Sequence, residues 1–188
     1  MPEGLRADAR ANHDRLLETA AAAFATEGPN ASLKAIASQA GVGIGTLYRR
    51  FPSREDLIEA VYRSETDRLG GAAEALLAER PPVDALRAWM ESFVDYMVTK
   101  QGMSDALPSI LASREGLRAH SRDALASAVT ALVEAARASG DVRADVDPAD
   151  VLMAVGGITL ISGHEDQRDL ASRLIEMLLG GLLARSSG

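Results

Sequence analysis

One run near the start of the chain, residues 32–57, constrains the fold more than any other segment: SLKAIASQAGVGIGTLYRRFPSREDL. Its pattern predicts two short helices joined by a glycine-containing turn, then a third helix that opens at a capping box. The second short helix carries Thr46, Tyr48, Arg49 and Arg50, which favour contact with a partner over burial in a core. This arrangement is typical of a helix-turn-helix that binds DNA in the major groove.

The composition excludes several classes of protein. The chain has 188 residues and no Cys, so disulfides, Cys-ligated zinc fingers and thiol catalysis are excluded and a reducing compartment is favoured. No apolar segment reaches the roughly 18 residues that span a bilayer, and the N-terminus lacks the apolar core of a secretion signal. We therefore expect a cytoplasmic protein without a membrane span, and no pattern in the chain requires a cofactor.

Alanine and leucine dominate while β-branched residues are scarce, which favours an all-α fold. Apolar periodicity and capping signals predict about nine helices and no strand. The expected helices cover residues 8–26, 33–39, 43–50, 53–79, 83–100, 104–112, 114–139, 148–162 and 165–184. We expect an N-terminal tri-helical helix-turn-helix domain over 1–52, continuing into a linking helix over 53–79, and a helical C-terminal domain over 80–188.

The charge is unevenly distributed. The net charge is −7, but residues 1–64 hold eight Lys or Arg and eight Asp or Glu, so the whole acidic excess lies in residues 65–188. Lys34, Arg49, Arg50 and Arg54 lie together in the run that predicts DNA binding. Affinity for phosphate depends on the local placement of basic side chains, so the acidic total does not argue against a DNA-binding surface.

Residues 35–61 resemble the DNA-binding signature of TetR-family transcriptional regulators. The matching positions are Ile36-Ala37, Ala40-Gly41-Val42, Gly45-Thr46-Leu47-Tyr48, Phe51, Ser53-Arg54 and Leu57. The resemblance covers roughly residues 8–60. The remaining chain is similar to the family only in the number and length of its helices and in total size.

The resemblance implies a role for each DNA-facing position. Ser32, Thr46, Tyr48 and Arg54 are expected to bind phosphates, whereas Lys34, Ile44 and Arg49 are expected to reach base edges. Gly43 and Gly45 let the helix approach the DNA closely. Two positions depart from the family pattern: Gly43 replaces a commoner serine, and Arg50 stands where histidine is frequent. Arg50 is either a DNA contact or a solvated side chain.

For the C-terminal domain the resemblance implies a small-molecule effector. Aromatic and Met side chains form adaptable apolar sites, and the same side chains are as compatible with a packed core. The candidates for effector binding are Trp89, Phe93, Tyr96, Met97, Met103, Leu107, Ile110, Val129 and Met153.

The resemblance also implies a homodimer. The helix predicted over 148–162 is apolar almost all round, which indicates an interface. Two copies of the last two helices would form a four-helix bundle around a two-fold axis, and the operator would be a near-palindrome. The candidate interface residues are Val151, Val155, Ile158, Leu170, Leu174 and Leu178.

These features together predict a dimeric repressor that binds double-stranded operator DNA and is released by a small, largely apolar effector. The alternative is a DNA-binding regulator or architectural protein without an effector, and activation instead of repression stays open. An enzyme would need convergent polar groups in the C-terminal domain, and the pattern shows none. His13, His120 and His164 share no metal-ligand spacing, so we expect no metal site.

Overall fold

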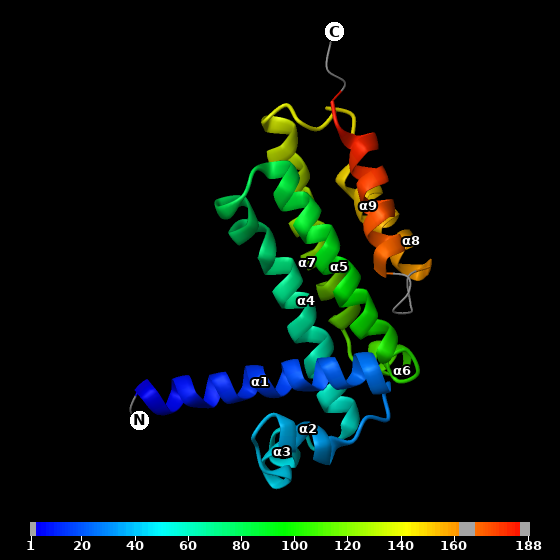
Figure 1. Ribbon diagram of the computed structural model, residues 1–188. Helices are drawn as coiled ribbons and strands as arrows, with labels where there is room; N and C mark the ends of the chain where they lie inside the picture. The colour runs from blue at the N-terminus through cyan, green and yellow to red at the C-terminus, as the bar shows by residue number, and fades with distance from the viewer. Residues whose placement is uncertain (1–2, 162–167, 185–188) are drawn as a thin grey trace. The chain divides into compact units, whose positions relative to one another are not determined.

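The computed structural model describes residues 3–161 and 168–184. The regular secondary structure of these residues is helical apart from an isolated bridge between Val142 and Leu183 (Figure 1). The all-α prediction is confirmed. The predicted start of the last helix at 165 or 166, and His164, lie outside the described residues. The helices are α1 (Glu3–Glu27), α2 (Leu33–Gln39), α3 (Ile44–Arg50), α4 (Arg54–Glu79), α5 (Pro82–Gly102), α6 (Leu107–Ser113), α7 (Leu117–Ala138), α8 (Pro148–Ile161) and α9 (Arg168–Leu182).

Most helix boundaries follow the capping signals. Helix α8 begins at Pro148, where the Ala149 N–H donates to Asp147 Oδ1 at 2.8 Å. Helix α6 has Pro108 in its first turn, where the missing N–H of proline has no intrahelical partner to lose. Helix α5 extends to Gly102, two residues beyond the predicted helix end at residue 100.

The chain folds into two compact units. Unit 1 comprises Met1–Glu65 and Thr99–Leu117, and unit 2 comprises Thr66–Val98 and Arg118–Gly188. Unit 1 therefore holds α1, α2, α3, the first part of α4, the end of α5 and α6. The sequence analysis placed the whole of residues 80–188 in the C-terminal domain, and that boundary stays a prediction; within the structure, residues 99–117 pack in the same compact unit as the helix-turn-helix.

Glycines and a capping serine shape the turns of unit 1. Gly28 has a φ of +76° and its N–H donates to the Phe24 carbonyl at 3.0 Å, which ends α1. Ser32 Oγ accepts the Ala35 N–H at 3.3 Å and caps α2. Gly41, with a φ of +70°, forms the turn before α3. The core beneath is apolar, and its best buried members, each at most 1% exposed, include Leu16, Ala20, Phe24, Ile36, Ala37, Leu47, Leu57, Ile58 and Val61.

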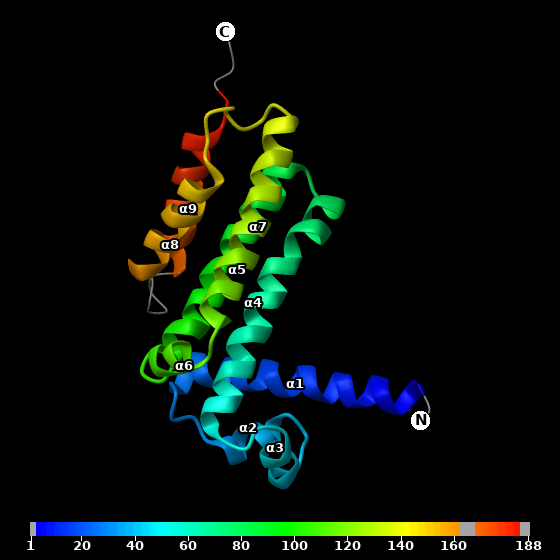
Figure 2. The same cartoon turned by 180° about the vertical axis from the view of Figure 1, so that it is seen from behind.

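Within unit 1, the end of α5 lies directly against the backbone of α1. A Cβ atom built on Gly102 would lie 2.1 Å from the Phe24 carbonyl oxygen and 2.9 Å from Ala25 Cα. Only glycine allows this approach, because real Cβ atoms do not come so close to a backbone. In Figures 1 and 2 alike, α6 lies beside the C-terminal end of α1. This contact explains why residues 99–117 belong to unit 1.

Unit 2 packs around the aromatic side chains of α5. Trp89 is fully buried, and its Nε1–H donates to the Leu69 carbonyl of α4 at 2.9 Å. The rings of Trp89, Phe93 and Tyr96 follow one another with centroids 5.6 and 5.8 Å apart. Both views show α8 and α9 side by side (Figures 1 and 2).

The contact at Gly102 gives a direct test of this packing. We expect Gly102→Ala to lower the free energy of unfolding by about 1–3 kcal/mol, because the backbone of α1 cannot yield as a flexible side chain would. Gly71→Ala is the matched control: nothing lies within 4 Å of a Cβ there, and alanine in a helix should add about 0.5–1 kcal/mol. Urea unfolding followed by circular dichroism measures both, and an unchanged stability for Gly102→Ala would contradict the contact.

Candidate nucleic-acid interface

Helix α3 is attached to unit 1 through one inward side chain. Leu47 is its only buried residue. Tyr48 and Ile44 are 49% and 39% exposed, and the remaining residues of the helix are exposed as well. A short helix that buries one side chain and exposes an aromatic one, an aliphatic one and two arginines is suited to contact a partner.

Thr46 and Arg49 contact each other on the exposed side of α3. Arg49 Nη2 donates to Thr46 Oγ1 at 3.0 Å, across one helical turn. The remaining donors of the Arg49 guanidinium and the hydroxyl hydrogen of Thr46 therefore lie close together on the exposed side of α3. Donors grouped in this way match the acceptor atoms of DNA, which lie both on phosphates and on base edges.

The other predicted contacts lie on α2, on α3 or at the starts of these helices and of α4. Ser32 keeps its O–H free to donate, because its oxygen acts as the acceptor in the cap of α2. Gly43 starts α3 without a side-chain cap. Eight of the nine predicted DNA-contacting residues are exposed in unit 1: Ser32, Lys34, Gly43, Ile44, Thr46, Tyr48, Arg49 and Arg50.

Arg54, the ninth, has a structural role that the sequence analysis missed. Its Nη1 donates to the carbonyls of Pro29 and Ala31 at 2.8 and 2.7 Å, and so fastens the loop between α1 and α2 to the start of α4. Backbone carbonyls have no sequence signature, so no pattern could reveal these partners. The phosphate contact of Arg54 stays a prediction.

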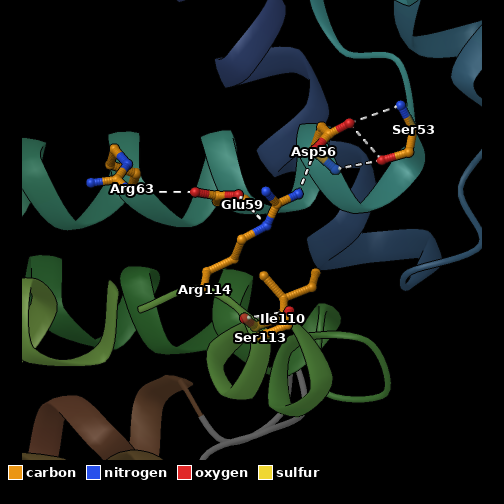
Figure 3. A network of polar contacts seen from close by, with 7 residues as sticks. All are labelled: Ser53, Asp56, Glu59, Arg63, Ile110, Ser113 and Arg114. Carbon is orange, nitrogen blue, oxygen red and sulfur yellow. Dashed lines mark hydrogen bonds and ion pairs between the residues drawn. The ribbon is translucent and has the colours of Figure 1, made fainter. Parts of the chain in front are cut away.

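The capping box at the start of α4 is confirmed (Figure 3). Asp56 Oδ2 accepts the Ser53 N–H at 3.1 Å and the Ser53 hydroxyl at 2.7 Å, and Ser53 Oγ accepts the Asp56 N–H at 3.1 Å. The hydrogen bond from the Ser53 hydroxyl is the main cause of a lowered pKa of Asp56, and Arg114 acts in the same direction. Asp56 is therefore a charged cap at neutral pH.

Arg114, which follows the last turn of α6, ties that turn to α4. Its Nη2 lies 2.7 Å from Asp56 Oδ1 and its Nε lies 3.0 Å from Glu59 Oε2. Glu59 Oε1 also pairs with Arg63 at 3.3 Å, so a chain of charges follows the first turns of α4 (Figure 3). Sequence reasoning missed Arg114 because 58 positions separate it from Asp56.

His13 joins α1 to the end of α3. Its ring stacks on Phe51 with centroids 5.9 Å apart. Burial lowers the pKa of His13, and the nearby charge of Arg50 lowers it further against the opposing effect of Asp14. The imidazole is therefore neutral at neutral pH, which suits an apolar contact with a phenyl ring.

The candidates for effector binding divide between the two units. Met103, Leu107 and Ile110 are buried in unit 1. Met153 is 75% exposed on α8, so it lies on the surface of the protomer instead of in an apolar interior. The other candidates lie in unit 2, buried except for the half-buried Met97: Trp89, Phe93, Tyr96, Met97 and Val129.

Two of the six candidates for the dimer interface face inward. Val151 and Val155 are 2% and 0% exposed within the protomer. Their helix is apolar on all sides, so periodicity did not reveal which face packs internally. Ile158, Leu170, Leu174 and Leu178 are half-buried. The apolar side chains that face outward are Met153, Leu160 and Met177, at 75%, 74% and 73% exposed.

The described residues contain neither a metal-binding cluster nor a membrane-spanning helix. No group of three or more His, Asp or Glu side chains there is placed to hold a metal ion. None of the described helices is both long enough and apolar enough to cross a membrane.

Comparison with known proteins identifies the family of both parts of the chain. Residues 16–61 match the tetR family of bacterial regulatory proteins, and residues 81–184 match the C-terminal domain of SbtR-like transcriptional regulators. The chain belongs to the TetR family. This family consists of transcriptional regulators and not of enzymes, so the predictions of the family and of a non-enzymatic protein are confirmed.

Solved TetR-family structures are similar over nearly the whole chain. The TetR transcriptional regulator SCO0520 from Streptomyces coelicolor is 47% identical, with a TM-score of 0.87 over 92% of this chain and 99% of that one. LfrR from Mycobacterium smegmatis, solved in complex with proflavine, is 26% identical, with a TM-score of 0.67 over 93% and 99% of the two chains.

The curated relatives match a shorter stretch. The HTH-type transcriptional regulator UidR of Escherichia coli (strain K12) is 33% identical over 99 residues, which is 52% of this chain and 45% of UidR. The chain therefore matches less than half of the length of this relative.

Proposed function

We propose that this TetR-family regulator is a ligand-responsive repressor that binds a near-palindromic operator as a homodimer in the bacterial cytoplasm. The observation that supports DNA reading most strongly is the exposure of every residue of α3 except Leu47. In this proposal Ser32, Thr46 and Tyr48 bind phosphates, which position the protein, and Ile44 and Arg49 reach base edges, which specify the sequence.

We place the effector site at three buried hydroxyl groups of unit 2. Tyr96 Oη lies 3.2 Å from Ser121 Oγ, and Thr66 Oγ1 lies 3.4 Å from Ser121 Oγ and 3.5 Å from Tyr96 Oη. A hydroxyl group can both donate and accept a hydrogen bond, so this cluster offers polar partners to a ligand oxygen. Apolar side chains surround the group, with the Phe93 ring 5.8 Å from that of Tyr96. The site would suit a largely apolar effector with one hydrogen-bonding group.

The complex of LfrR with proflavine supports a small-molecule effector. The second candidate is a regulator without an effector, and one observation favours it: the Trp89 indole N–H is already bonded to the Leu69 carbonyl, as in a packed core. A thermal-shift screen separates the two candidates. In our proposal a compound that raises Tm also weakens DNA binding, and Thr66→Val abolishes both effects. If no compound raises Tm, the second candidate is favoured.

The outward face of α8 and α9 would form the dimer contact. Met153, Leu160 and Met177 are largely exposed there. Gly157 and Gly180 are exposed too, and a Cβ on either would meet nothing within 4 Å. Large apolar side chains beside glycines on neighbouring helices suit close packing against a second copy around a two-fold axis.

Substitutions in α3 test the DNA-reading role. Arg49→Ala should relax the base preference and cost about 1–3 kcal/mol on the preferred duplex only, whereas Tyr48→Phe should weaken binding to all duplexes alike. The wild-type protein first selects its preferred duplex from a random pool, and gel-shift titrations then compare that duplex with an unrelated one. Full affinity and unchanged preference in both variants would show that α3 does not contact DNA.

A charge on the outward face of α9 tests the dimer. Met177→Glu should shift the protein from dimer to monomer in sedimentation velocity, because a carboxylate would be buried without a partner. Ser127→Glu, which adds the same charge at an exposed position of α7, should leave the dimer intact. A dimer that survives Met177→Glu would place the interface elsewhere.

A further inference from the structure

An open groove of about 500 Å³ lies between α1 and α3 within unit 1. Its floor is apolar and its rim carries hydrogen-bond donors, and none of its lining residues is acidic. It is lined by Asn12, Leu16, Val42, Thr46, Arg49 and Arg50. The predicted DNA contacts used only the α3 side of this groove, so the α1 side has no assigned role.

The orientation of Asn12 is set by Arg15. Arg15 Nη2 donates to Asn12 Oδ1 at 2.5 Å. A guanidinium can only donate, so the oxygen of the Asn12 amide faces Arg15 and its NH₂ group points to the other side. Asn12 therefore offers N–H donors at the rim of the groove.

Arg15 in turn is fixed to the helix-turn-helix. Its Nε donates to the carbonyl of Ala40, the residue that ends α2, at 2.9 Å. One guanidinium thus links α1, the turn between α2 and α3, and the Asn12 amide. The donor of α1 is held in a constant position relative to the turn that carries α3, which is the property required of a residue that positions DNA.

We infer that this groove holds the sugar–phosphate backbone of the DNA strand beside α3, with Asn12 as a phosphate-binding residue of α1 and Arg15 as its positioning residue. The amide of Asn12 and the guanidinium group of Arg50 supply donors and positive charge to a phosphate. The apolar floor of Leu16 and Val42 suits the carbon face of a deoxyribose.

The occupant is DNA backbone because the groove is continuous with the DNA-reading surface. Thr46 and Arg49 belong both to the groove and to the exposed side of α3. A strand that reaches them would pass over Asn12 as well. This inference rests on the proposed DNA binding, and it adds a contact from α1 that recognises DNA irrespective of sequence.

Variants of Asn12 test the inference by fluorescence anisotropy on the selected duplex and on an unrelated one. Asn12→Ala should raise Kd about 10-fold on both duplexes, as expected for a lost hydrogen bond to a charged group. Asn12→Asp should raise Kd several times more, because a carboxylate repels phosphate. Ala22→Asp is the control: Ala22 is an exposed residue of α1 outside the groove lining, about 15 Å further along the helix, and should change Kd less than 2-fold.

The salt dependence separates the two kinds of donor. Arg50→Ala should reduce the slope of log K against log salt by about 0.9, because it removes one counterion-releasing charge, whereas Asn12→Ala should leave the slope unchanged. A duplex series with single neutral methylphosphonates gives a second measurement. One position should weaken wild-type binding yet have no further effect on Asn12→Ala, the coupling expected of a direct contact.

Three outcomes distinguish the claims. If Asn12→Ala and Asn12→Asp bind both duplexes like the wild type, or if every methylphosphonate acts equally on wild type and Asn12→Ala, the groove does not hold the backbone although DNA binding stands. If Asn12→Ala loses affinity for DNA together with a large fall in Tm, the Arg15→Met variant is measured next. Wild-type affinity of Arg15→Met for both duplexes would overturn the role of Arg15 in positioning Asn12. If the wild type binds neither duplex, the proposed function itself fails.

Discussion

The contact between Gly102 and the last turn of α1 is the constraint on which the organisation of unit 1 depends. Two backbones meet there with no room for a Cβ atom, so the end of α5 cannot separate from α1 without opening a packed surface. Arg114 repeats the connection by joining the end of α6 to Asp56 and Glu59 of α4. Residues 99–117 are thus part of the body that supports α3, although they lie far from it in the chain.

Two groups of arginines in unit 1 have different roles. Arg15, Arg54 and Arg114 donate hydrogen bonds to carbonyls and carboxylates within the protein. Arg49 and Arg50 stand exposed on α3. The first group fixes the loops and helix ends around α3, so the backbone that carries α3 is already ordered before a partner binds. The negative net charge of the whole chain does not argue against phosphate binding at α3, because affinity for phosphate depends on the local placement of basic side chains.

Local features of this chain could be predicted from its sequence, and distant ones could not. The caps at Ser32 and Ser53 and the start of α8 at Pro148 depend on residues within one turn, so short motifs predict them. The partners of Gly102, Arg54 and Arg114 lie tens of positions away and include plain backbone atoms. The apolar helix α8 shows a third limit: with apolar residues on every side, its periodicity could not tell that Val151 and Val155 face inward while Met153 and Leu160 face outward.

The central claim is that residues 99–117 and the helix-turn-helix form one cooperative unit that holds α3 for DNA. Amide hydrogen exchange with and without the selected duplex tests it most directly. We predict that DNA slows amide exchange in residues 32–57 and in residues 107–113, and that the opening free energy rises by a similar amount in both segments. Exchange in residues 168–182 should change little. Exchange in residues 107–113 that is unaffected by DNA, or that follows residues 168–182 instead, would contradict the account.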